Sequence, residues 1–116
     1  MRTAIVTCLA LFALAATALA DPAGVYDIEG KEPGGGSAYK GIVTVERTGE
    51  TYRVVWDVDG ERYFGTGVGN KEFIAISYRS RNASGLALYG AEGRNWKGIW
   101  AYSEGRDLGA ERWTRR

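Results

Sequence analysis

Alternation of residue types over residues 51–58 is the feature that most constrains the fold of this chain. Tyr52, Val54, Trp56 and Val58 share one parity, and they alternate with Thr51, Arg53, Val55 and Asp57. A period of two puts such residues on one face of a β-strand. The run ends at Asp59-Gly60, and Asp-Gly between two alternating runs is a strong hairpin signal. The sequence therefore predicts an antiparallel hairpin at this point.

The rest of the chain after residue 20 follows the same pattern. No stretch has three turns of helical apolar spacing, and glycine, of which the chain has 17, interrupts nearly every window. Eight strands are predicted, at 24–29, 39–47, 51–58, 61–68, 72–78, 85–90, 95–102 and 108–114. Most connections are short, and a parallel crossover needs about a dozen residues or more, so only hairpins fit. The prediction is one all-β domain over 21–116, an eight-stranded antiparallel up-and-down meander.

Each predicted strand carries one large aromatic residue, at intervals of 11 to 15 residues. These residues are Tyr26, Tyr39, Tyr52, Tyr63, Tyr78, Tyr89, Tyr102 and Trp113. Glycines recur on the same parity, and a glycine beside a ring relieves crowding on a strongly curved sheet. Closing the meander removes both unpaired edges. We therefore expect a small closed barrel with the rings inside, where they either form a packed core or line a cavity open at one mouth.

The first twenty residues have the pattern of a secretory signal peptide. Arg2 precedes an apolar run over 4–14, and small residues follow up to Ala18-Leu19-Ala20. A membrane-spanning helix needs about twenty apolar residues, which this stretch does not reach. We expect cleavage after Ala20 and a periplasmic or secreted mature protein. Cys8 lies in the signal segment, so the mature chain has no thiol and no disulfide.

Charge and composition exclude several classes of function. The chain has 15 basic and 14 acidic residues, which gives no electrostatic footprint for nucleic acid. It has no histidine and only one cysteine, Cys8, so the usual transition-metal ligands and the Ser-His-Asp and cysteine nucleophiles are missing from the mature chain. We expect no cofactor, no metal site and no enzymatic activity.

A set of short glycine and aromatic motifs covers nearly all of the expected mature chain. The motifs are Gly24-Val25-Tyr26, Tyr39-Lys40-Gly41, Tyr52-x-Val54-x-Trp56, Tyr63-Phe64-Gly65-Thr66-Gly67, Gly85-Leu86-Ala87-Leu88-Tyr89, Trp96-Lys97-Gly98-x-Trp100 and Gly109-Ala110-Glu111-Arg112-Trp113. Together they resemble a group of small exported bacterial proteins of largely unknown role, some of them labelled fibronectin-binding. More distantly, the layout is similar to the calycin-like barrels of avidins and lipocalins, a resemblance that implies a small ligand held inside.

The leading hypothesis is a non-enzymatic binding barrel whose interior rings contact a small apolar or aromatic ligand. The candidate ligand-binding residues are Tyr52, Trp56, Tyr63, Trp96, Trp100 and Glu111. Glu111 shares parity with Gly109 and Trp113, so it faces either the interior, with tyrosine hydroxyls as partners, or solvent if the parity of this strand is inverted. A buried carboxylate requires hydrogen-bonding partners.

The alternative hypothesis is an interaction protein that uses its outer surface, as an adhesin for a host matrix protein such as fibronectin or as an inhibitor of a secreted enzyme. Phe64, Ile74 and Ile76 are expected to form an exposed apolar patch, and such patches commonly mark partner sites. A filled interior favours this alternative, whereas an empty one favours a ligand.

Stability is expected to depend on the aromatic face. Trp56 lies in the middle of the clearest strand, and Trp56→Ala is predicted to cost about 3–5 kcal/mol. Trp113 lies near the chain end, and its truncation is predicted to be milder.

Overall fold

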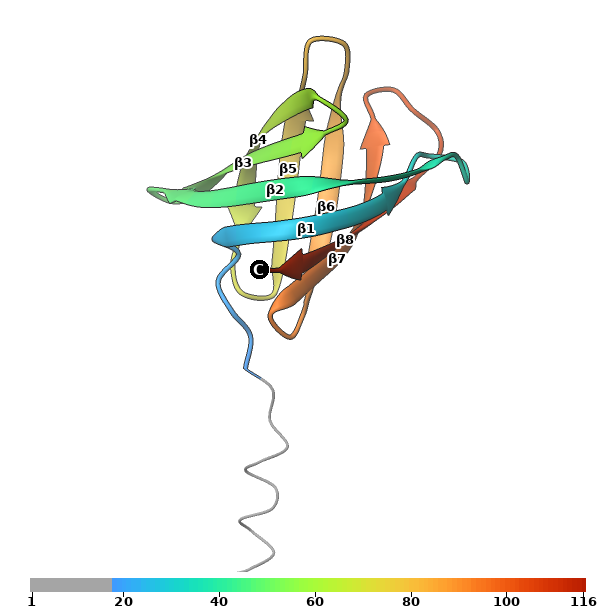
Figure 1. The fold of residues 1–116 in the computed structure, drawn as a ribbon. Coiled ribbons are helices and arrows are strands. Elements are labelled where there is room, and N and C mark those ends of the chain that lie inside the picture. The colour runs from blue at the N-terminus through green and yellow to red at the C-terminus, as the bar shows by residue number, and fades with distance from the viewer. Residues whose placement is uncertain (1–17) are drawn as a thin grey trace, which may run out of the picture.

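The computed structural model describes residues 18–116, which form a closed barrel (Figure 1). Its strands are β1 (Gly24–Lys31), β2 (Ala38–Thr48), β3 (Thr51–Val58), β4 (Glu61–Gly69), β5 (Phe73–Arg79), β6 (Ser84–Glu92), β7 (Asn95–Tyr102) and β8 (Gly109–Arg115). Each strand pairs antiparallel with the next, and β1 pairs with β8 to close the sheet. The predicted eight-stranded up-and-down barrel is confirmed. The expected signal peptide falls almost entirely on residues 1–17, outside the described part.

The two ends of the barrel are built differently. Loops 32–37, 59–60, 80–83 and 103–108 surround one end, which we call the mouth (top in Figure 1). At the other end, the segment before β1 lies across the opening. Pro22 is buried there, and its carbonyl accepts a 2.6 Å hydrogen bond from the Tyr26 hydroxyl. Arg115 donates to the carbonyls of Asp21 and Ala23, each at 2.9 Å. Residues 21–23 therefore lie over this end of the barrel and are hydrogen-bonded to it.

The barrel is filled by aromatic and branched side chains whose parity follows the strand alternation. The fully buried residues include Tyr26, Tyr52, Tyr89, Trp96 and Trp113. Rings contact one another across the interior, and the Tyr89 and Trp113 centroids lie 4.3 Å apart. Most of the interior is therefore a packed core, as is usual for the close-packed interiors of native proteins.

One expectation about individual side chains is wrong, and the reason given for a second one does not hold. Ile74 and Ile76 do not form an exposed patch but are 0% and 2% exposed, because they share the inward parity of Tyr78 on β5. Trp113 is fully buried although it lies near the chain end, because β8 is the strand that closes the barrel against β1. Its truncation is therefore not expected to be mild. Phe64 does lie outside, with Arg53 stacked over its ring.

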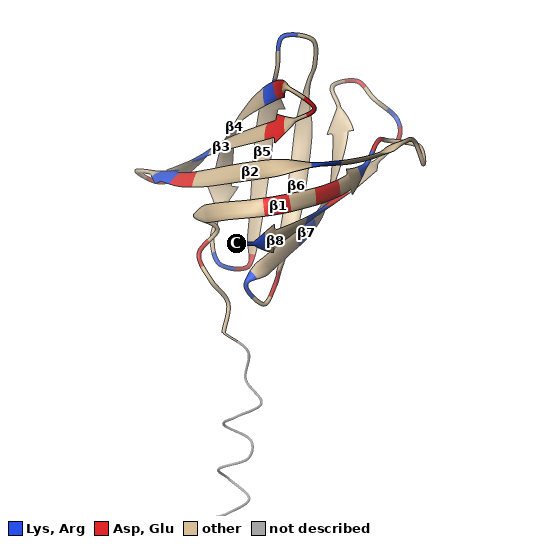
Figure 2. Cartoon of the chain, viewed as in Figure 1, with Lys and Arg blue, Asp and Glu red and all other residues tan. Residues whose placement is uncertain are grey.

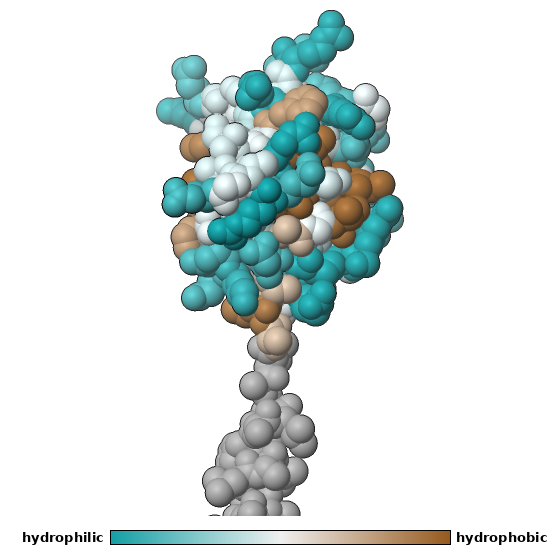
Figure 3. Space-filling view, turned by 90° about the vertical axis from the view of Figure 1, so that its left-hand side faces the viewer, coloured by the Kyte–Doolittle hydropathy of each residue, from teal (hydrophilic) through white to brown (hydrophobic). Residues whose placement is uncertain are grey.

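The outer wall carries charges of both signs, spread over strands and loops (Figure 2). The side seen in Figure 3 interleaves hydrophilic and hydrophobic side chains. On strands β4 to β8, outward-facing apolar residues stand side by side in register. This outer apolar row consists of Val68, Ala75, Leu88, Ile99 and Ala110. Residues 18–116 contain no helix with the length and hydropathy of a membrane span.

Candidate functional site

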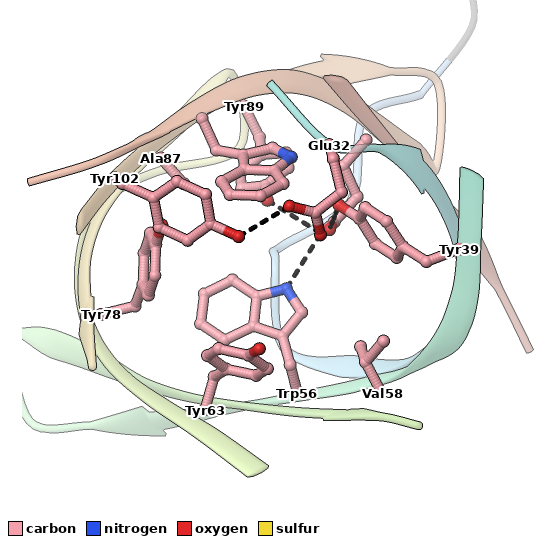
Figure 4. Close-up of a pocket in the computed structure, with 11 residues that line it drawn as sticks. Glu32, Tyr39, Trp56, Val58, Tyr63, Tyr78, Ala87, Tyr89 and Tyr102 are labelled. Atoms are coloured by element: carbon pink, nitrogen blue, oxygen red, sulfur yellow. Dashed lines mark hydrogen bonds between the residues drawn. The ribbon is translucent and has the colours of Figure 1, made fainter. Parts of the chain in front are cut away.

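A pocket opens at the mouth of the barrel (Figure 4). Its volume is about 60 Å³, so it is a small space that can hold more than one water-sized group. Side chains from β2 to β8 and from the loop after β1 line it. The lining residues are Glu32, Tyr39, Trp56, Val58, Tyr63, Tyr78, Ala87, Tyr89, Trp100, Tyr102 and Glu111. Seven of these eleven side chains are aromatic.

Glu111 lies at the base of this pocket and is 6% exposed. Its Oε2 atom accepts hydrogen bonds from the Trp113 indole at 2.7 Å, the Tyr89 hydroxyl at 2.8 Å and the Trp56 indole at 2.9 Å. Its Oε1 atom accepts one from the Tyr39 hydroxyl at 2.5 Å. Glu111 therefore faces the interior and joins four strands through one carboxylate, as the inward reading of its parity predicted.

Glycines explain how the two tyrosines reach this carboxylate. Tyr39 stands opposite Gly30, and Gly30 stands opposite Glu111 on the next strand. On the other side, Gly98 stands between Tyr89 and Glu111. A Cβ at Gly30 would collide with the Tyr39 ring, and one at Gly98 would collide with the Tyr89 ring. Each ring therefore lies over a bare glycine backbone, which brings its hydroxyl to Glu111.

The donors around Glu111 fit an ionised carboxylate. An indole N–H can only donate a hydrogen bond, so Oε2 accepts from both Trp56 and Trp113. No lysine or arginine of residues 18–116 forms a salt bridge with Glu111. Burial, followed by the charge of Glu111, raises the pKa of both Tyr39 and Tyr89 above the usual value. Glu111 is therefore a buried negative charge that is stabilised by neutral donors alone.

A second carboxylate lies at the entrance. Glu32, in the loop after β1, accepts a 2.7 Å hydrogen bond from the Tyr102 hydroxyl on β7 (Figure 4). Burial raises the pKa of Tyr102, and its hydrogen bond to Glu32 raises it further. The Glu32 and Tyr102 pair therefore bridges the mouth above the pocket.

Neighbouring rings in the pocket wall stand nearly perpendicular to one another. Tyr78 contacts Trp56, Tyr63 and Trp100 edge to face, with centroid distances of 5.9, 6.2 and 6.3 Å. Edge-to-face contact is a favourable arrangement of aromatic pairs. The indole N–H of Trp100 is buried and has no hydrogen-bond partner within residues 18–116. The wall is therefore held in place mainly by ring packing.

Of the six residues predicted to bind a ligand, Trp56, Tyr63, Trp100 and Glu111 line this pocket. The other two, Tyr52 and Trp96, are buried at the closed end of the barrel and do not line it. The Tyr52 hydroxyl lies beside Asp21 Oδ2, at 3.1 Å, and accepts a 2.8 Å hydrogen bond from Arg47.

The other seven lining residues were not among the predicted ones; they are Glu32, Tyr39, Val58, Tyr78, Ala87, Tyr89 and Tyr102. A signal for most of them was present in the sequence. In an up-and-down meander, the starts of even strands and the ends of odd strands lie at the same end of the barrel. Tyr39 begins β2, and Tyr78 and Tyr102 end β5 and β7, whereas Tyr52 and Trp96 begin odd strands. Glu32 lies in a loop, where parity gives no information.

The chemistry available in the pocket is that of ring faces, hydroxyl groups and two carboxylates. Within residues 18–116, no group of three or more histidine, cysteine, aspartate or glutamate residues is placed to hold a metal ion. Each carboxylate accepts hydrogen bonds from tyrosine hydroxyls of the lining, Glu111 from Tyr39 and Tyr89 and Glu32 from Tyr102. A scan against protein-family models finds no match for the chain, and searches of curated proteins and of solved structures find none either.

Proposed function

We propose that this protein is an exported, non-enzymatic binding protein that holds a small ligand in the pocket at the barrel mouth. The observation that carries the proposal is the wall of seven aromatic side chains around a space of about 60 Å³ at the mouth. Small-molecule sites are typically concave, mostly apolar and equipped with a few polar groups. Because the space is small, the bound part of the ligand is a compact group rather than a large molecule.

Tryptophan fluorescence and native mass spectrometry test this proposal. The purified mature protein is titrated with a panel of compact apolar, aromatic and charged molecules. Trp56 and Trp100 line the pocket, so a ligand that enters changes their emission and adds its mass to the native protein. A panel in which no compound changes the emission and no bound mass appears would contradict a binding role.

Two alanine-to-leucine variants, one in the pocket and one on the outer wall, distinguish a ligand that enters the pocket from one that binds the surface. Ala87 lines the pocket, and Ala101 stands on the outer wall beside Leu86. Ala87→Leu fills part of the space and is expected to weaken binding at least about tenfold, since about 1.4 kcal/mol is tenfold in affinity. Ala101→Leu is expected to leave binding unchanged. Equal effects of both variants would place the ligand elsewhere.

A second candidate function is recognition of a protein partner by the outer wall. The observation that favours it is the outer apolar row on β4 to β8, whose Val68, Leu88 and Ile99 are 55%, 49% and 45% exposed. Exposed apolar patches of this kind commonly mark interfaces. On this reading, the resemblance to proteins labelled fibronectin-binding points to a matrix protein as the partner.

Surface plasmon resonance on immobilised fibronectin tests the second candidate. Binding at micromolar concentration that Leu88→Lys abolishes, and that Ala87→Leu does not change, would support it. An absence of binding by the wild-type protein would exclude the matrix-adhesin version of this role.

A further inference from the structure

The pocket combines aromatic walls with an excess of negative charge. Among its eleven lining residues, the two that carry a formal charge are Glu32 and Glu111. Neither lysine nor arginine is part of the lining, although Arg79 and Arg81 lie close by in the exposed part of the mouth. A ligand in this space therefore meets two carboxylates and no cation.

The excess of negative charge in the pocket is unusual because one of its two carboxylates, Glu111, is buried. Burying a carboxylate is costly unless it is paired or fully hydrogen-bonded. Four neutral donors satisfy its oxygens, but they add no positive charge. Its negative potential is therefore not cancelled inside the barrel, and the surrounding rings lower the local dielectric so that the potential extends into the pocket.

The aromatic wall favours the same kind of ligand. The face of an aromatic ring is negative, and a cation within about 6 Å of a ring centroid gains about 0.5–2 kcal/mol. Trp56 and Trp100 each contact Tyr78 at interplanar angles of 65° and 75°, so ring faces meet the pocket from different directions. Recognition of quaternary ammonium groups by cages of aromatic rings is a known use of this geometry.

On these grounds we propose that the ligand of this pocket is an organic cation, with a compact ammonium headgroup that enters the aromatic cage above Glu111 while Glu32 faces it at the mouth. The inference rests on the proposed function and specifies its ligand class. The small volume, about 60 Å³, restricts this headgroup to a compact one such as trimethylammonium.

A charged and a neutral probe of the same shape test the charge requirement. Choline and its carbon isostere 3,3-dimethyl-1-butanol are titrated against the mature protein by calorimetry and tryptophan fluorescence. Choline is expected to bind about tenfold more tightly than the isostere, in line with a cation–π gain of about 0.5–2 kcal/mol. Equal or tighter binding of the isostere would overturn the cation assignment and leave the proposed binding function standing. No binding of either probe, or of any panel compound, would remove the binding function itself.

A variant that removes the negative charge of Glu32 at the mouth tests the proposal independently. Glu32 is only partly buried, so Glu32→Gln is expected to fold, and its amide oxygen can still accept the hydrogen bond from Tyr102. Its choline affinity is expected to fall about threefold to tenfold, with the affinity for the isostere unchanged. Glu29→Gln, on the exposed outer face of β1, is the matched control and is expected to change neither. Identical loss for both probes in Glu32→Gln would contradict a role of its charge.

Discussion

The indole N–H of Trp56 on β3 donates a 2.9 Å hydrogen bond to the carboxylate of Glu111 on β8. The two strands are not neighbours in the sheet, so this bond crosses the barrel interior instead of following its wall. Trp56 and Glu111 also line the pocket. The same contact therefore contributes both to the stability of the barrel and to the shape of the proposed site.

Removing the charge of Glu111 is expected to destabilise the protein strongly. Glu111→Gln places an amide N–H₂ among donors from Trp56, Tyr89, Trp113 and Tyr39, and each unsatisfied buried donor costs about 1–3 kcal/mol. We expect the free energy of unfolding in urea to fall by about 3 kcal/mol or more. The exposed Glu29→Gln control should change it by less than about 0.5 kcal/mol. A wild-type midpoint for Glu111→Gln would mean that the carboxylate is not the centre of this network.

Truncating either buried tryptophan of the network is expected to be equally severe. Trp56 is 5% and Trp113 0% exposed, and large aromatic truncations in cores cost about 3–5 kcal/mol. A domain of this size has only about 5–15 kcal/mol of stability, so both alanine variants should be largely unfolded or close to it. Leu86→Ala, at a position 68% exposed, serves as the control in the same urea titrations. A mild effect of Trp113→Ala would instead support the sequence-based expectation that truncating a residue near the chain end costs little stability.

Glycines beneath the tyrosine rings are expected to be intolerant of a methyl group. A Cβ at Gly98 would collide with the Tyr89 ring and with the Leu88 carbonyl, and overpacking of this kind typically costs about 1–3 kcal/mol. Gly90 lies in the same sheet, and a Cβ added there would have no other heavy atom within 4 Å. Gly98→Ala should therefore lower the thermal midpoint by several degrees, and Gly90→Ala should not. Equal midpoints would show that Tyr89 can move without loss.

Stability is expected to fall at alkaline pH. Burial raises the pKa of Tyr39, Tyr78 and Tyr89 in the folded protein, whereas tyrosines of the unfolded chain ionise near a pKa of about 10. Above this pH the unfolded state holds fewer protons than the folded state, so the free energy of unfolding decreases as pH rises. Below about pH 10 this contribution is fully present.

Tyrosinate absorbance and circular dichroism, followed together through an alkaline titration, check this expectation. Ionisation of these buried tyrosines should coincide with the loss of β-sheet signal. Complete ionisation of all seven tyrosines near pH 10, with the fold intact, would contradict their burial.

The segment that closes the far end of the barrel gives a prediction about processing. The predicted cleavage after Ala20 would leave Asp21 as the first residue. Its carbonyl accepts a hydrogen bond from Arg115, and its carboxylate accepts a 3.1 Å hydrogen bond from the Tyr52 hydroxyl. Intact-mass measurement of the purified mature protein should give a chain that begins at Asp21.

Deletion of residues 21–23 from this mature chain should lower the free energy of unfolding by about 2 kcal/mol, the scale of hydrogen bonds to a charged group. A deletion variant as stable as the parent would show that the far end needs no closing segment.

The sequence is enough to predict the strands because their signals are local. Alternation, Asp-Gly and short glycine-rich connections specify hairpins, and the parity of Glu111 with Gly109 and Trp113 indicates which way it points. The alternation predicts whether a side chain points inward, but it does not predict how far along the barrel axis that side chain lies. The position along the axis depends on the register of strands that are distant in sequence. For this reason the sequence pattern does not distinguish Tyr52 and Trp96, which lie at the closed end, from Trp56 and Trp100, which line the pocket. Ile74 and Ile76 face inward because they share the parity of Tyr78 on β5.

Nuclear magnetic resonance of the four tryptophan indole N–H groups tests the central claim most directly. Trp56 and Trp100 line the pocket, whereas Trp96 and Trp113 do not. During a titration with choline, the indole resonances of Trp56 and Trp100 are predicted to shift in a saturable way, with Trp96 unchanged. Shifts confined to backbone amides of the outer apolar row, such as Leu88 and Ile99, with all four indoles unchanged, would contradict a ligand site inside the barrel.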